Sequence, residues 1–265
     1  MSLVVAGGLL AGCAGGARHP AEATHDGGSR QSGSPSPGAS PGTTGTPSGG
    51  SDAAAFTPAA DLVPRTAGAA RRLADSVVLA PTDWGRGFTA QNPAASTPGT
   101  WPVLDAGCRW EREKLPRGVL ASTSRYSRLP ADGGKGTVDV TAAVTTHASV
   151  LGADDQLGTT LENVLRCARQ QLRADERITG LMSLGTPFGA REQQYADASV
   201  LEAGTYTGAS GGAQPYRWMV ARVGTVVAAV SVTGAKGWTQ PELDRLGTTA
   251  LAQMLTRVQQ QLKEK

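Results

Sequence analysis

The residues whose spacing most resembles a nucleophilic site are 208–212, which read Gly-Ala-Ser-Gly-Gly and match the pattern G-x-S-x-G. This pattern exposes a serine only when a strand precedes it, a helix follows it, and a catalytic histidine comes later in the chain. Here the flanking residues are turn-like, and no histidine follows His147. We therefore interpret the segment around Ser210 as a flexible Gly/Ser loop.

His147 is the one histidine outside the N-terminal region, because His19 and His25 both precede residue 50. A histidine titrates near neutral pH and could act as a general base. His147 ends a predicted strand on its polar side, so we predict a solvated surface residue. A cell-envelope hydrolase that uses His147 and nearby carboxylates is kept as an alternative.

The sequence predicts no metal site and no cofactor. One histidine in the domain excludes a multi-histidine zinc site, and the spacing of the cysteines matches no metal knuckle. Asp154 and Asp155 fall in the first turn of a predicted helix, where acidic side chains complement the helix dipole. We prefer that interpretation to a cation site.

The first cysteine suggests an anchor. Residues 10–13, Leu-Ala-Gly-Cys, follow a short apolar run and resemble the lipobox of bacterial lipoproteins. The resemblance implies that Cys13 is lipidated and becomes the first mature residue, that residues 1–12 are the remnant of a signal peptide, and that the protein sits on the outer face of the cell membrane. The run departs from the pattern because no Lys or Arg precedes it. The alternative is a disordered apolar N-terminus with an incidental cysteine.

Composition divides the rest of the chain into two parts. Residues 13–56 are dominated by Gly, Ser, Pro and Thr, so we predict a disordered tether. Residues 57–265 are predicted to form the globular domain. The formal net charge of +3 is too small and too dispersed to indicate nucleic-acid binding. No stretch of the domain has the 18 consecutive apolar residues of a membrane-spanning helix.

Cys108 and Cys167 are the two cysteines of the domain. In an oxidising compartment outside the membrane they are expected to form a disulfide, which we expect to join a helix to a strand. In the cytosol they would be two buried thiols.

The periodicity of the domain predicts a single α+β domain with an antiparallel-rich sheet and about three packed helices. Gly/Pro-rich segments at 82–100 and 185–215 are predicted loops. The predicted helices span 64–79, 154–172 and 239–262, and the predicted strands span 101–113, 119–129, 138–146, 178–184, 216–223 and 225–232.

Three aromatic residues are candidates for a ligand or partner surface. Trp84 and Trp101 flank the first predicted loop, and Tyr206 lies in the second. Aromatic side chains in such loops can line a cleft between the loops and the sheet. Ordinary packing is the alternative.

Three stretches of the domain are similar to the extracellular sensor domains of actinobacterial receptor Ser/Thr kinases and to related surface lipoproteins with a PsbP/Mog1-like fold. They are "GCRW" at 107–110, "LRCARQQL" at 165–172 and "WMVARVGTVVAAVSVTG" at 218–234. The chain departs from those sensor domains in having one cysteine pair where they typically have two.

The resemblance implies a non-enzymatic sensor or binding module for a small ligand, a cell-wall component or a protein partner, with the membrane reached through the lipid. The alternatives are the hydrolase and a structural scaffold of the envelope.

Overall fold

The computed structural model describes residues 56–208 and 212–264. The predicted signal remnant, Cys13, the tether before Phe56, and Ser210 lie outside the described residues. Within them the helices are α1 (Ala67–Val77), α2 (Val150–Arg166), α3 (Glu192–Tyr195) and α4 (Gln240–Leu262), with 3-10 turns at Pro81–Trp84 and Gly189–Arg191.

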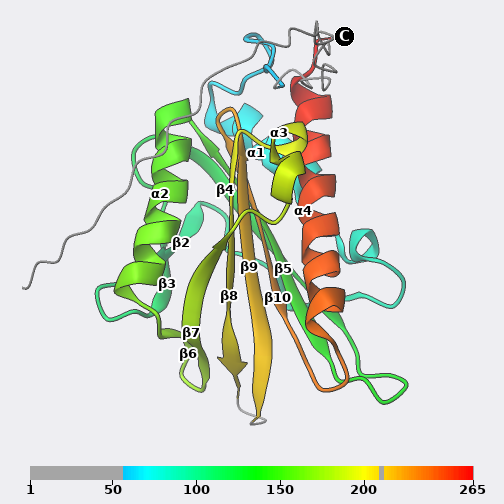
Figure 1. Cartoon of the computed structure of the whole chain (residues 1–265). Coiled ribbons are helices and arrows are strands. Elements are labelled where there is room, and N and C mark those ends of the chain that lie inside the picture. The colour runs from blue at the N-terminus through cyan, green and yellow to red at the C-terminus, as the bar shows by residue number, and fades with distance from the viewer. Residues whose placement is uncertain (1–55, 209–211, 265) are drawn as a thin grey trace, which may run out of the picture. The chain divides into compact units, whose positions relative to one another are not determined.

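The strands confirm the α+β prediction. Eight of them form one curled sheet in the order β1-β4-β5-β10-β9-β8-β7-β6, in which every neighbouring pair is antiparallel (Figure 1). The strands are β1 (Thr89–Ala95), β2 (Thr100–Leu104), β3 (Trp110–Lys114), β4 (Val119–Leu129), β5 (Val138–His147), β6 (Gln170–Arg173), β7 (Glu176–Gly185), β8 (Ala198–Thr207), β9 (Ala213–Val223) and β10 (Val226–Thr233).

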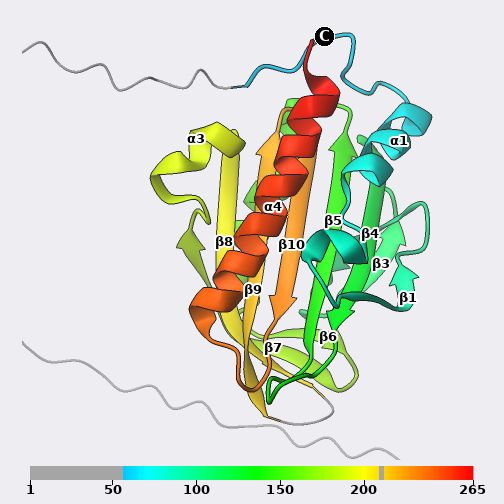
Figure 2. The same ribbon diagram turned by 90° about the vertical axis from the view of Figure 1, so that its right-hand side faces the viewer.

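The connection through α2 sets the layers of the domain. After β5, the chain crosses one face of the sheet as α2 and enters the far edge at β6. It then returns strand by strand until β10 pairs with β5. Figure 1 shows α2 on one face of the sheet and α4 on the other, and Figure 2 shows α4 lying over β9 and β10. The β2–β3 hairpin is a separate two-stranded sheet on the α2 side.

The main core lies between the sheet and the pair α1 and α4. The predicted hairpin at 216–232 is confirmed: β9 and β10 pair in continuous register around Gly224, whose φ of 56° favours glycine. Successive valines and alanines of β10 are buried on alternate faces, so the strand is covered on both sides. A continuous apolar sequence is typical of such a strand.

The final helix begins as its sequence predicts. Thr239 accepts from the backbone N–H of Glu242, and the Glu242 carboxylate accepts from the N–H of Thr239, which completes a capping box. Gly247 allows close approach to the sheet, because a Cβ there would lie 2.9 Å from the Met219 side chain. The first helix begins later than predicted: Thr66, not Pro64, marks its start, because the Thr66 hydroxyl caps Ala69.

Two predicted elements have wrong bounds. The helix predicted over 154–172 begins at Val150, after the cap residue Ser149, and ends at Arg166, because Cys167 leaves helical geometry. The single strand predicted over 101–113 is the β2–β3 hairpin. The Asp105 carboxylate accepts from the backbone N–H of Arg109 at 2.8 Å and closes the turn. Even-numbered residues of both arms share one face of the hairpin, so the alternation expected of a single strand continues through the turn.

The two predicted loops are partly strands. The first contains β1, and the second contains β8, which lies inside the sheet rather than at its edge. Both were missed because small and turn-forming residues interrupt their apolar pattern. Within the described part of the chain, no helix is both long enough and apolar enough to cross a membrane.

Candidate functional site

A cavity of about 380 Å³ lies between the β2–β3 hairpin and the face of the main sheet on which α2 also packs. Its walls come from both edges and the centre of the curled sheet. Five aromatic side chains line it: Trp110, Tyr126, Tyr206, Tyr216 and Trp218.

Strand register brings the floor of this cavity together. Tyr126 of β4 lies opposite Thr141 of β5, Thr141 lies opposite Ser231 of β10, and Ser231 lies opposite Trp218 of β9. Residues paired in this way share one face of the sheet. The alternate residues of the same strands face α1 and α4, so the apolar core and the polar cavity are built from opposite faces of the same strands.

The β2–β3 hairpin forms one wall. Pro102 and Arg112 are paired across it and both line the cavity, as does Trp110. Trp101 and its partner Glu113 occupy alternate positions and do not line it.

The wall is fastened at the turn end of the hairpin. The Cys108–Cys167 disulfide, with a Cα–Cα distance of 5.6 Å, joins the turn to the end of α2. The Trp110 Nε1 donates to Gln170 Oε1 at 2.7 Å. Arg166 donates to the carbonyl oxygens of Asp105 and Leu104 at 2.9 and 3.1 Å. The predicted pairing is confirmed, but its partner is the hairpin turn rather than a strand of the main sheet.

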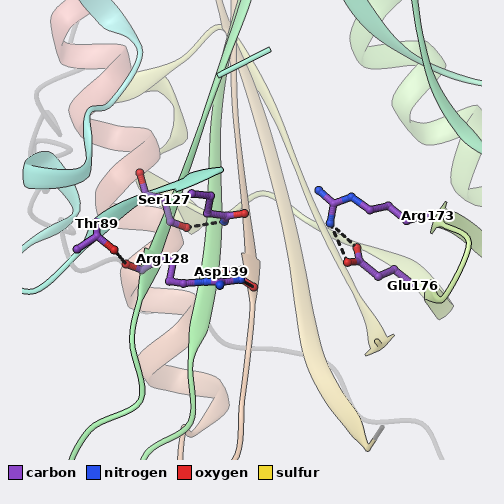
Figure 3. Close-up of polar contacts among 7 residues, drawn as sticks. Thr89, Ser127, Arg128, Asp139, Arg173 and Glu176 are labelled. Atoms are coloured by element: carbon purple, nitrogen blue, oxygen red, sulfur yellow. Dashed lines mark hydrogen bonds and ion pairs between the residues drawn. The ribbon is translucent and has the colours of Figure 1, made fainter. Parts of the chain in front are cut away.

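Two ion pairs flank the cavity. Arg128 of β4 donates to both carboxylate oxygens of Asp139 at 2.8 and 3.0 Å. Arg173, at the end of β6, donates to both oxygens of Glu176 at 2.7 and 2.8 Å. Figure 3 shows the first pair beside β4 and β5 and the second pair on the opposite side, near the β6–β7 hairpin.

Charges from both ion pairs act on the Tyr206 phenol. Burial is the largest cause of its raised pKa of about 12, and the charges of Glu176 and Asp139 add to it. The Tyr206 phenol is therefore neutral over the physiological range and can both donate and accept hydrogen bonds. The prediction placed Tyr206 in a loop, whereas it lies on β8.

Below this site, Glu202 of β8 is a buried carboxyl, 2 % exposed, opposite Trp218. Its Oε1 has no hydrogen-bond partner in the described structure. Burial raises the pKa of Glu202 to about 8, so it is largely protonated at neutral pH. Burial is also the largest cause of the raised pKa of Tyr216, and the charge of Glu202 adds to it.

His147 is not the solvated residue that the sequence predicts. It is 4 % exposed, and its Nε2 lies 2.7 Å from Oε1 of Gln156 on α2. Burial lowers the pKa of His147, while the Gln156 hydrogen bond and the charge of Asp155 oppose that shift. The residue does not line the cavity. The prediction failed because α2 covers this end of β5, which strand alternation alone does not reveal.

Trp84 does not belong to a surface. It is 7 % exposed and stacks on Phe88 with ring centroids 6.1 Å apart. The prediction for Trp84 is therefore wrong, because the Pro81–Trp84 turn directs the indole into the core. Trp101 is half-buried at the far end of the hairpin from its turn, and it does not line the cavity.

Sequence reasoning missed most of the cavity, including Trp110, Arg112, Tyr126, Arg128 and Trp218. A signal was present. In β10, Ser231 and Thr233 interrupt an apolar run, and polar and aromatic residues occupy the matching face of its neighbours. When a strand is buried on both faces but carries polar residues at one end, the element that packs on that face does not extend over that end.

Two other features of the described surface have less of the character of a ligand site. A second cavity of about 430 Å³ lies between α1 and β4, and no aromatic side chain lines it. α2 exposes Val150, Leu151, Leu161 and Leu165, and nothing in the described structure shows what would cover them. Among residues 56–208 and 212–264, no group of three His, Cys, Asp or Glu side chains could hold a metal ion.

No protein-family model and no curated protein sequence matches the chain. Among solved structures, the chain is similar to the extracellular domain of PknH from Mycobacterium tuberculosis, with 14 % sequence identity and a TM-score of 0.47. The match covers 77 % of this chain and 99 % of that domain. At this level of similarity the likeness assigns no function to the chain. The geometry of the cavity is the basis for its function.

Proposed function

We propose that this protein is a binding module that takes up a small amphipathic ligand in the cavity between the β2–β3 hairpin and the sheet and performs no covalent chemistry. The observation that carries the proposal is the cavity itself. Its aromatic faces lie beside hydroxyl groups and paired charges, in the combination typical of small-molecule sites. Its volume of about 380 Å³ suits a ligand of modest size.

The arrangement favours binding over catalysis. A hydrolase built on His147 needs that residue in a cleft beside a carboxylate, with an ordered nucleophile or water. His147 instead contacts an amide at the covered end of β5 and stands outside the cavity lining. The cavity carboxylates Asp139 and Glu176 are each bound by an arginine through both of their oxygens, which leaves neither carboxylate unpaired in the cavity.

We also propose an extracytoplasmic location, with the domain held at the membrane by lipidated Cys13. The Cys108–Cys167 disulfide supports a compartment outside the cytosol, because disulfides persist mainly in oxidising compartments. A ligand-dependent sensor role would follow if binding changed the contacts of the hairpin wall.

The test is a thermal-shift screen of the full chain against a library of water-soluble small molecules, with hits confirmed by calorimetric titration. Three variants locate the hits. Trp110→Ala removes an aromatic face from the cavity, and Trp110→Phe restores a face without the Nε1 donor to Gln170. Trp101→Ala is the matched control, because it truncates the same residue type on the same hairpin at a position outside the cavity lining.

We expect hits that bind the wild type, Trp101→Ala and Trp110→Phe, and that bind Trp110→Ala at least about tenfold more weakly. Hits that bind Trp110→Ala as tightly as the wild type would place binding elsewhere and contradict the proposal, as would the absence of any confirmed hit.

A further inference from the structure

The charges that line the cavity balance. Three arginines and three carboxylates contribute, and two arginines are already paired with two of the carboxylates inside the cavity. The third carboxylate, Glu111, lies 3.5 Å from Arg109 outside the lining. The six charged side chains are Glu111, Arg112, Arg128, Asp139, Arg173 and Glu176.

This balance disfavours a charged ligand. An anion would meet three carboxylates, and the N–H groups of Arg128 and Arg173 that bind Asp139 and Glu176 could turn to it only by releasing those carboxylates. A cation would meet the same arginines. A neutral ligand leaves both ion pairs intact, so it avoids the free-energy cost of breaking a charge-assisted hydrogen bond.

The same ion pairs offer donors and acceptors side by side. Each arginine keeps N–H groups beyond those that contact its carboxylate, and each carboxylate oxygen keeps a free lone pair. A hydroxyl group both donates and accepts. A set of neighbouring hydroxyls on one ring therefore matches such a pair, whereas a plain hydrocarbon ring does not.

The aromatic residues supply the apolar surface that complements the nonpolar part of a ligand. Trp110, Tyr126 and Trp218 are half-buried and contribute apolar ring surface to the cavity. A sugar ring has apolar C–H faces and a rim of hydroxyls. On the basis of the proposed binding function, we infer that the ligand is a neutral saccharide, with its ring faces on the aromatic side chains and its hydroxyls on the two ion pairs.

Arg112 adds a specificity contact. Its Nε and Nη2 donate to the hydroxyl and the carbonyl oxygen of Thr100, both at 2.9 Å. In the described structure Arg112 has no carboxylate partner, and its Nη1 donates to no protein group. This donor selects a ligand with an acceptor oxygen near the hairpin wall, as in an acetamido or glycosidic group.

The experiment is calorimetric titration of the full chain with disaccharides that differ in charge on one skeleton. N,N′-Diacetylchitobiose is neutral, and its deacetylated form, the glucosamine dimer, is a dication in mildly acidic buffer. Cellobiose is neutral, and cellobiouronic acid is an anion. Maltose and trehalose extend the neutral set, and 2-naphthol supplies a neutral aromatic ring with one hydroxyl.

We expect at least one neutral disaccharide to bind at least about tenfold more tightly than both charged disaccharides. We expect the same disaccharide to bind at least about tenfold more tightly than 2-naphthol. Asp139→Asn should weaken that binding about tenfold, and Asp132→Asn, an exposed turn residue outside the lining, should leave it unchanged.

Three results would overturn the saccharide inference: equal or tighter binding of a charged disaccharide, preferred binding of 2-naphthol, or no binding of any neutral disaccharide. The screen with Trp110→Ala and Trp101→Ala separates this failure from failure of the binding function. Cavity-dependent hits that are not saccharides would leave the binding function standing.

Discussion

Arg128 and Asp139 lie directly opposite each other on β4 and β5 and form two parallel hydrogen bonds at the side of the cavity. Their side chains are 49 % and 37 % exposed. An exposed ion pair contributes little to folding, roughly 0–1 kcal/mol, because solvent screens it. Its geometry at the cavity therefore points to a role in binding rather than in stability.

The first prediction separates these roles. Asp139→Asn should change the free energy of unfolding by no more than about 1 kcal/mol in urea denaturation. Asp83→Asn should cost more, because Asp83 binds Arg257 with two hydrogen bonds at a less exposed place and joins the 3-10 turn to α4. Equal losses for the two variants would contradict the functional interpretation of Asp139.

The second prediction concerns the fastened wall. The double variant Cys108→Ala/Cys167→Ala should lose up to about 4 kcal/mol of stability, the chain-entropy value for a loop of 59 residues. Hydrogen exchange of the full chain should show faster exchange at the backbone amides of β2 and β3, with little change in β9 and β10. Unchanged exchange in the hairpin would show that Arg166 and Trp110 hold the wall without the disulfide.

The third prediction follows from Glu202. Its carboxyl ionises near 4.5 in the unfolded chain, and burial raises the pKa to about 8 in the fold. Between these values the folded state retains a proton that the unfolded state releases. The contribution of Glu202 to stability is therefore full below pH 4.5 and is lost as pH rises toward 8.

Glu202→Gln removes this dependence. The stability of the variant minus that of the wild type should rise from pH 5 to pH 8, as measured by chemical denaturation at each pH. A difference that stays constant over this range would show that Glu202 is not buried as an uncharged acid.

The fourth prediction has the opposite sign. Burial lowers the pKa of His147 below its ordinary value of 6.5, so the unfolded chain takes up a proton before the fold does. The contribution of His147 to stability is present above pH 6.5 and is lost as pH falls. His147→Gln should therefore lose more stability relative to the wild type at pH 7.5 than at pH 5. The reverse trend would contradict the burial of a neutral imidazole.

The sequence predicted the parts of the fold where a local pattern and the tertiary environment agree. The capping box of Thr239 and Glu242 starts α4 as expected, and the apolar β9–β10 hairpin forms around Gly224. The sequence-based prediction failed where a covalent or tertiary contact overrides the local pattern. Alternation continues through 101–113, but Asp105 and the disulfide at Cys108 turn the chain within that span.

The candidate site was less accessible to sequence reasoning. Tyr206 was chosen as an aromatic in a loop and reaches the cavity from a strand. Trp84, chosen on the same argument, is buried in the core. A cavity on a curled sheet depends on which strands become neighbours. The pairing of β5 with β10 brings Thr141 beside Ser231, a residue 90 positions later in the chain, and no local periodicity encodes that pairing.

The central claim, that the cavity between the β2–β3 hairpin and the sheet is the binding site, is tested most directly by ¹⁹F NMR of the full chain labelled with 5-fluorotryptophan. The chain has five tryptophans. Trp110 and Trp218 line the cavity, whereas Trp84, Trp101 and Trp238 do not. Each resonance is assigned by a single Trp→Phe substitution.

On addition of a ligand confirmed by calorimetry, we predict that the Trp110 and Trp218 resonances shift in a saturable manner and that the other three stay in place. A ligand that shifts Trp84, Trp101 or Trp238 and leaves the Trp110 and Trp218 resonances unmoved would contradict the account.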